Sequence, residues 1–195
     1  EGSKITSHGE AMLSLGVHPR LAHMMIKAKG LHQGRSAALL GALITEKEIF
    51  IDGQRRESDL ALRFQAINEA NSYGLDRNSS ALVKQSRDLF LKKLGGPKGA
   101  EGNEENLLGV LLGLAYPDRI AKIRHAKSNR YLLSGGKGAQ LRLEDALFGE
   151  PYLVIANLES SKSDAQIYSA LSITEGQIEA YFSHLITQER HVKFN

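Results

Sequence analysis

Hydrophobic residues recur every three or four positions through the first half of the chain. Leu21, Met24, Met25 and Ala28 have this spacing, which places them on one face of a helix. Similar spacing continues as far as Leu94. The pattern predicts a bundle of five helices, which we place at residues 7–16, 19–30, 36–50, 57–70 and 78–94.

Local signals mark several of the expected helix ends. Ser7 and Glu10 have the spacing of a capping box, and Gly16 suits the end of the first helix. Pro19 suits the first position of the second helix, where its missing N–H costs nothing. In the fifth helix, the positions that we expect to face the core are Leu82, Val83, Ser86, Leu89, Phe90 and Leu94.

Residues 95–103 are rich in glycine and have the composition of a flexible linker. Residues 104–116 follow, and their leucines predict a helix that is buried on most sides. The change in composition at the linker predicts two units. The first spans residues 1–94, and the second spans residues 104–195.

The hydrophobic period changes after Tyr116. Thr174 and Gln177 have the spacing to cap a helix over residues 175–184. Apolar and aromatic runs predict short strands over residues 130–133, 152–158, 165–171 and 189–194. Several short strands with one helix inserted before the last strand are typical of an OB-like barrel. The predicted fold class is therefore α+β, an N-terminal helical bundle followed by a small OB-like β-barrel.

The composition is ordinary for a soluble globular protein, with 42% hydrophobic and 24% charged residues. The longest apolar run, at residues 107–116, is about half of the roughly twenty residues that cross a membrane, so we expect no membrane partner. No stretch has the pattern of a secretory signal. The absence of cysteine excludes disulfides, zinc–thiolate sites and cysteine nucleophiles, and it fits a cytoplasmic protein.

Positive charge is concentrated in one stretch, although the net charge is only +3. Residues 119–142 contain no acid and seven basic residues, Arg119, Lys122, Arg124, Lys127, Arg130, Lys137 and Arg142. Clustered cations attract polyanions. We interpret the first four as flanking a groove that follows a phosphate backbone, with Arg130 and Lys137 extending it. The alternative is a set of strands whose charged side chains simply face solvent.

Tyr131 lies inside this basic run. An aromatic side chain beside a cationic groove can stack on a base of a single-stranded nucleic acid. A tyrosine in a short strand is equally well placed as a core residue on the inner face of a barrel. Both interpretations stay open from the sequence.

A second basic group lies on the polar face of the expected fifth helix, at Lys84, Arg87, Lys92 and Lys93. Lys84 and Arg87 are further candidates for contact with nucleic acid. The alternative is a solvated helix face, which needs no ligand.

The motifs of common catalytic sites are absent from the sequence. Gly136-Lys137-Gly138 lacks the hydroxyl residue that a phosphate-binding loop places after its lysine. The seven histidines include no pair with zinc-protease spacing, and no nucleophile elbow occurs. We therefore assign no catalytic residue and no metal ligand, and we expect the chain by itself not to hydrolyse nucleotides. A stand-alone enzyme of unknown chemistry is the weakest interpretation.

Several segments resemble the bacterial HrpB family of DExH-box RNA helicases. They are residues 9–24, which include His18-Pro19-Arg20-Leu21, then residues 115–121, 130–139 and 149–156. Their order and spacing are similar to that family along most of the chain, and residues 31–94 match it mainly in pattern. The resemblance implies a helical ratchet bundle followed by an OB-like domain, an accessory C-terminal fragment of a larger helicase.

The resemblance also implies partners and a mechanism. Motor domains elsewhere in the polypeptide would use ATP and magnesium to step along single-stranded RNA, so no cofactor is expected in this fragment. The ratchet bundle would prevent backsliding, and the OB-like domain would guide the strand. Expected partners are single-stranded RNA, with DNA as an alternative, the motor and winged-helix domains, and a regulatory protein.

Three finer points follow from the resemblance. Ser58-Asp59 stands where the wider family has a Gly-Asp pair that opens a ratchet helix near RNA. Residues 83–89 resemble the basic helix whose polar face meets RNA, and Arg20 would pack at the winged-helix boundary. The alternative function is a protein-docking module, in which apolar residues near Tyr152 and Phe148 bind a regulator or another domain.

Overall fold

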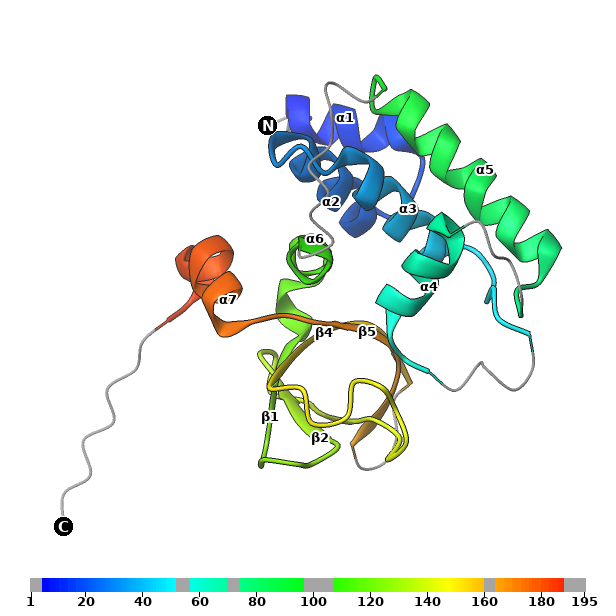
Figure 1. Cartoon of the computed structure of the whole chain (residues 1–195). Coiled ribbons are helices and arrows are strands. Elements are labelled where there is room, and N and C mark those ends of the chain that lie inside the picture. The colour runs from blue at the N-terminus through cyan, green and yellow to red at the C-terminus, as the bar shows by residue number, and fades with distance from the viewer. Residues whose placement is uncertain (1–4, 52–56, 70–73, 97–106, 160–163, 188–195) are drawn as a thin grey trace, which may run out of the picture.

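A computed structural model describes residues 5–51, 57–69, 74–96, 107–159 and 164–187. Helices fill the first half and a small barrel lies below them in the view of Figure 1. The five helices of the bundle are α1 (Ser7–Leu15), α2 (Pro19–Gly30), α3 (Gly34–Thr45), α4 (Leu60–Asn68) and α5 (Arg77–Lys93). The five helices predicted from the hydrophobic spacing are therefore confirmed, with shifts at their ends.

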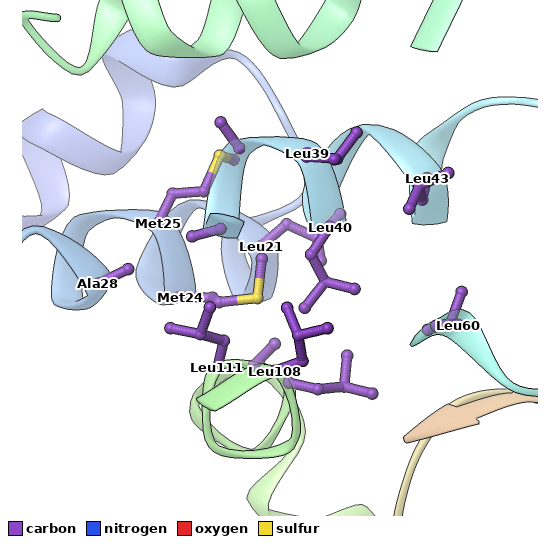
Figure 2. Close-up of a cluster of buried hydrophobic side chains, with 14 of the residues drawn as sticks. Leu21, Met24, Met25, Ala28, Leu39, Leu40, Leu43, Leu60, Leu108 and Leu111 are labelled. Atoms are coloured by element: carbon purple, nitrogen blue, oxygen red, sulfur yellow. The ribbon is translucent and has the colours of Figure 1, made fainter. Parts of the chain in front are cut away.

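The main core forms where α2 and α3 meet a sixth helix, α6 (Leu108–Ala115). Figure 2 shows side chains of α2 pointing toward α6, among them Leu21 and Met24 on one side and Leu108 and Leu111 on the other. All four are buried. A leucine-rich helix is buried on most sides here because it packs against both the bundle and the barrel.

Two predicted helix starts are one or more residues off. The side chain of Thr6, not Ser7, accepts the N–H of Gly9 and caps α1. Asp76 accepts the N–H of Ser79 and starts α5 earlier than the serine-rich segment suggested. A residue with a short polar side chain and an extended backbone makes a good N-cap. Thr6 and Asp76 have this backbone conformation, so they cap the helices in place of the neighbouring residues.

The prediction that α5 faces the core with Leu82 and Leu89 is wrong. Leu82 and Leu89 are 44% and 49% exposed, whereas Val83 and Phe90 are buried. Figure 1 shows α5 at the outer edge of the bundle, where it packs mainly on α3 and to a lesser extent on α1. Because α3 covers α5 on one side only, a narrow stripe of α5 is buried, and Leu82 and Leu89 beside that stripe stay at the surface.

The second half is a closed five-stranded barrel with the strand order β1-β2-β3-β5-β4. All neighbouring strands are antiparallel except β3 and β5, which are parallel. This architecture confirms the predicted OB-like barrel. The strands are β1 (Ile120–Ile123), β2 (Arg130–Leu133), β3 (Gly138–Gln140), β4 (Tyr152–Glu159) and β5 (Ala165–Ser172).

The barrel helix lies where the sequence predicts it, after the strand at residues 165–171. The described strands already form a closed barrel through the pairing of β1 with β4, and α7 (Glu175–Phe182) follows β5. Its capping box between Thr174 and Gln177 is confirmed in both directions. The expected closing strand at residues 189–194 lies outside the described residues.

Contact between helices and barrel is close where α6 crosses β5. A Cβ atom at Gly109 would overlap the backbone carbonyl oxygen of Ser172, so only glycine lets the two backbones approach this far. One hydrophobic cluster joins α2, α3 and α6 to Val154 and Leu171 of the barrel, and a second fills the barrel interior. The division at residues 95–103 stays a prediction, because residues 97–103 lie outside the described residues.

Candidate nucleic-acid interface

A row of polar side chains begins just after β1 and crosses β2, β3 and β5 on the outer face of the barrel. The N–H of Arg124 donates to the carbonyl of Arg130, Arg130 pairs with Gln140, and Gln140 pairs with Gln166. Side chains at paired positions lie on the same face of a sheet. The residues alternate with buried ones along each strand, so the row faces outward. We call Arg124, Arg130, Gln140 and Gln166 the outer row.

Three more predicted cations surround the outer row. Lys122 is exposed on β1, and its ammonium lies 5.3 Å from the ring centre of Tyr152. A hydrogen bond to the Tyr152 hydroxyl raises the pKa of Lys122. Lys127 is exposed in the β1–β2 loop, with a left-handed backbone, and Lys137 is exposed in the β2–β3 turn.

Arg119 lies apart from this face. Its guanidinium donates to the carbonyl of Ala156 at 2.7 Å and lies 5.0 Å from the ring centre of Tyr116. Both partners place it toward β4 and the end of α6, whereas Arg124 and Arg130 lean toward β5. The basic stretch is therefore continuous in sequence but divided in space.

The sequence missed an acid that compensates the basic stretch. Asp164, just before β5, lies 3.3 Å from the guanidinium of Arg124 and 3.8 Å from that of Arg130. Although residues 119–142 contain no acid, the charges of these two arginines are therefore compensated by Asp164. No local signal could reveal this, because the carboxylate comes from a segment 40 residues further along the chain.

Tyr131 is buried in the barrel, so its predicted stacking on a base is wrong and the alternative of a core residue is confirmed. Its side chain is fully enclosed, and its hydroxyl donates to the carbonyls of Leu147 and Glu150 at 3.3 and 3.0 Å. Burial raises its pKa to about 12. Side chains alternate along β2, so Arg130 and Leu132 point outward and Tyr131 points inward. Its partner on β3, Ala139, is also buried.

Tyr168, which the sequence did not single out, is an exposed aromatic residue on this side of the barrel. Tyr168 is 40% exposed on β5, two residues beyond Gln166 of the outer row. The guanidinium of Arg142, the last cation of the basic stretch, lies 6.0 Å from its ring centre. Its hydroxyl donates to Glu159 at 2.8 Å.

Lys84 and Arg87 lie on α5, away from the barrel in Figure 1. Lys84 is exposed, and Arg87 forms an ion pair with the neighbouring Asp88 at 2.8 Å. They are one turn apart and so share one side of the helix. The structure does not join them to the outer row, and any contact with nucleic acid there would be a separate one.

Ser58 and Asp59 hold the start of α4 against the barrel. The N–H of Ser58 donates to the buried carboxylate of Asp145 at 3.0 Å, and its hydroxyl donates to the carbonyl of Ile167 at 3.2 Å. Asp59 accepts the N–H of Ala61 and caps α4. The backbone N–H that a Gly-Asp pair would offer is thus already bound at Ser58.

Arg20 also connects the two halves of the described chain. Its guanidinium forms two hydrogen bonds with the carboxylate of Asp118 and lies 5.3 Å from the ring centre of Tyr116. The ion pair raises the pKa of Arg20 and lowers that of Asp118. In this chain Arg20 therefore packs against the segment that joins α6 to β1.

Within the described ranges, no three histidine, aspartate or glutamate side chains come together as a metal site. A search of those same ranges for a helix long and apolar enough to cross a membrane finds none.

Comparison with known proteins gives a consistent result. The chain is 31% identical over 197 aligned residues to the ATP-dependent RNA helicase HrpB of Escherichia coli, which covers all of this chain and 22% of that protein. A crystal structure of the E. coli DExH-box NTPase HrpB matches 95% of this chain and 21% of that chain with a TM-score of 0.74 at 32% identity. A second structure, of the E. coli DEAH/RHA helicase HrpB, matches 90% of this chain and 20% of that chain with a TM-score of 0.71 at 28% identity. No family model matches. The chain thus spans about a fifth of the length of these relatives.

Proposed function

Because this chain is an HrpB-type helicase-associated region, we propose that it contacts single-stranded RNA and guides the strand for motor domains in the same polypeptide. The observation that carries the proposal is the outer row, where Arg124 and Arg130 face solvent side by side. The motor domains would hold ATP and magnesium, and this region would contribute binding only.

The outer face has the two properties that small barrels use to hold single strands. Such barrels combine a cationic surface, which follows the phosphates, with an aromatic side chain on which a base stacks. Arg124, Arg130 and Lys127 supply the first property at the β1–β2 end. Tyr168 supplies the second in place of the buried Tyr131. Oligonucleotides commonly lie across the corresponding strands and loops of OB-like barrels.

The ratchet role belongs to the helical bundle in this proposal. Lys84 and Arg87 on the outer side of α5 would meet phosphates of a strand that runs along the bundle. Contacts between such cations and phosphates do not depend on base sequence, since phosphates carry no sequence information. A strand held at two separate places resists backward slipping better than a strand held at one.

Affinity for a fluorescent single-stranded RNA, measured over a range of salt concentrations, tests the proposal. On single strands each phosphate contact contributes about 0.7 to the slope of log affinity against log salt. The double variant Arg124→Gln with Arg130→Gln should lower that slope by about 1.4 and weaken binding roughly tenfold at low salt.

The charge-matched control is Lys27→Gln with Arg35→Gln, two exposed cations on α2 and α3 of the bundle. It should leave the slope within about 0.3 of the unmodified chain. Equal losses in the two double variants would mean that net charge alone is responsible. Absence of binding at low salt would rule the proposal out.

A second function is favoured by apolar side chains near the barrel surface. Leu143 is 72% exposed and Phe148 is 37% exposed, both in the connection between β3 and β4. In this alternative, the connection docks a regulatory protein or another helicase domain. Charge reversal at Arg124 and Lys127 separates the two functions, because docking would persist and RNA binding would not.

A further inference from the structure

Arg124 directly follows β1 and lies opposite Arg130 of β2, because its backbone N–H donates to the carbonyl of Arg130 at 2.9 Å. Two like charges placed opposite each other in this way destabilise a sheet unless an anion lies between them. Asp164 is that anion in this structure, since one of its oxygens approaches Arg124 and the other approaches Arg130. Its side chain is 16% exposed, less than either arginine.

The space that the carboxylate occupies is provided by a glycine. Gly138 begins β3, and a Cβ atom at that position would overlap a carboxylate oxygen of Asp164 and lie 2.5 Å from the guanidinium nitrogen of Arg124. No positive backbone angle requires glycine at this residue. The absence of a side chain is therefore what lets an anion and a guanidinium meet directly over the strand.

We propose that the Asp164 carboxylate occupies the position of an RNA phosphate between Arg124 and Arg130, and that a bound strand displaces it. This inference rests on the proposed function of the outer row. Guanidinium groups bind carboxylate and phosphate with the same planar pattern of donors. The carboxylate compensates the paired arginines in the free protein and competes with RNA, which lowers affinity and speeds release of the strand.

Weak, reversible binding of each phosphate suits a protein along which an RNA strand must move. Each ion pair of this kind, partly exposed to water, is weak and is exchanged easily. RNA phosphates can therefore replace Asp164 one at a time as the strand advances. A permanently open pair of arginines would bind each phosphate more tightly and retard the next step.

The test compares Asp164→Asn with the unmodified chain in the fluorescent RNA assay. Freeing the two arginines should raise affinity about fivefold at low salt and steepen the salt slope by about 0.7 to 1.4. The matched control is Glu179→Gln, which removes the same charge from an exposed position on α7 and should change affinity less than twofold. In Asp164→Asn combined with Arg124→Gln, most of the gain should disappear.

The outcomes separate this inference from the proposed function. Salt-dependent binding by the unmodified chain, with no gain in Asp164→Asn, would overturn the inference and leave the proposed function standing. Lower affinity together with a lower melting temperature would show that Asp164 only ties β5 to the arginines. No binding by any variant would remove both ideas. Should Asp164→Asn fail to fold, Asp164→Ser, which removes the same charge with a smaller side chain, should give the same gain.

Discussion

Arg63 on α4 is buried and forms a two-pronged ion pair with Glu48, in which Nε donates to Oε1 at 3.1 Å and a terminal nitrogen donates to Oε2 at 2.6 Å. The same guanidinium donates to the carbonyls of Asp59 and Glu57. One side chain thus fixes the segment after α3 and the segment before α4. This arrangement also explains why α3 ends at Thr45 and not near residue 50, as the hydrophobic spacing suggested.

Replacing Arg63 by methionine should therefore destabilise the protein strongly. Removal of one partner leaves Glu48 partly buried without its counter-ion, a change that costs about 3–5 kcal/mol in comparable pairs. The free energy of unfolding in urea, followed by circular dichroism, measures the loss. Arg87→Met is the control, because the Arg87–Asp88 pair is more exposed and should cost at most about 1 kcal/mol. Equal losses would contradict the role of Arg63.

Acid should weaken this junction through Glu48. Burial alone would raise the pKa of Glu48, but the Arg63 guanidinium and the N–H groups of Phe50 and Ile49 lower it below the ordinary value of 4.5. A carboxyl group whose pKa is lower in the folded than in the unfolded state stabilises the folded protein. This stabilisation is complete at pH values above the unfolded pKa and is lost as the pH falls through the folded pKa. Asp59 acts in the opposite direction, because burial raises its pKa.

Unfolding of the unmodified chain and of Glu48→Gln between pH 7 and pH 3 checks this expectation. The variant should be less stable at pH 7, and the difference between the two proteins should shrink below about pH 4.5. Glu179→Gln, at an exposed position, should follow the unmodified chain throughout. A constant difference across the whole range would show that Glu48 contributes through packing and not through its charge.

Alanine at Gly109 should disturb the contact between α6 and β5. The added Cβ would overlap the backbone oxygen of Ser172, which cannot rotate away as a side chain can. Overpacking of this kind costs about 1–3 kcal/mol. Gly176→Ala on α7 has no neighbour within 4 Å and should stabilise its helix by up to about 1 kcal/mol. Thermal melting of the two variants distinguishes these outcomes by sign, and a shared sign would contradict the close approach.

Some signals that act over a few residues were read correctly from the sequence, although the caps of α1 and α5 were not. The capping box at Thr174 and Gln177 and the start of α2 at Pro19 depend only on neighbouring residues. The hydrophobic period of α2 likewise predicts its buried side. Short strands carry less information. The strands β1 and β3, with four and three residues, were not predicted, whereas β2, with four residues, was.

The candidate interface depended on contacts that no local pattern contains. Alternation along β2 indicates that Arg130 and Tyr131 point to opposite sides, but it does not say which side is the inside. The approach of Asp164 to Arg124 and the turn of Arg119 toward Ala156 are set by the closure of the barrel. The sequence therefore predicted the charge of this surface but not its compensation or its shape.

Two tyrosine variants test the assignment of the aromatic residues. Tyr131→Phe removes the hydroxyl that donates to the carbonyls of Leu147 and Glu150, so it should lower the free energy of unfolding by about 1–2 kcal/mol. RNA affinity should not change, because the ring is enclosed. Tyr168→Leu should change stability by less than about 1 kcal/mol and weaken RNA binding by about 1–3 kcal/mol, the contribution of one stacked base. Loss of RNA affinity in a stably folded Tyr131→Phe variant, with Tyr168→Leu unaffected, would return Tyr131 to the interface and remove Tyr168 from it.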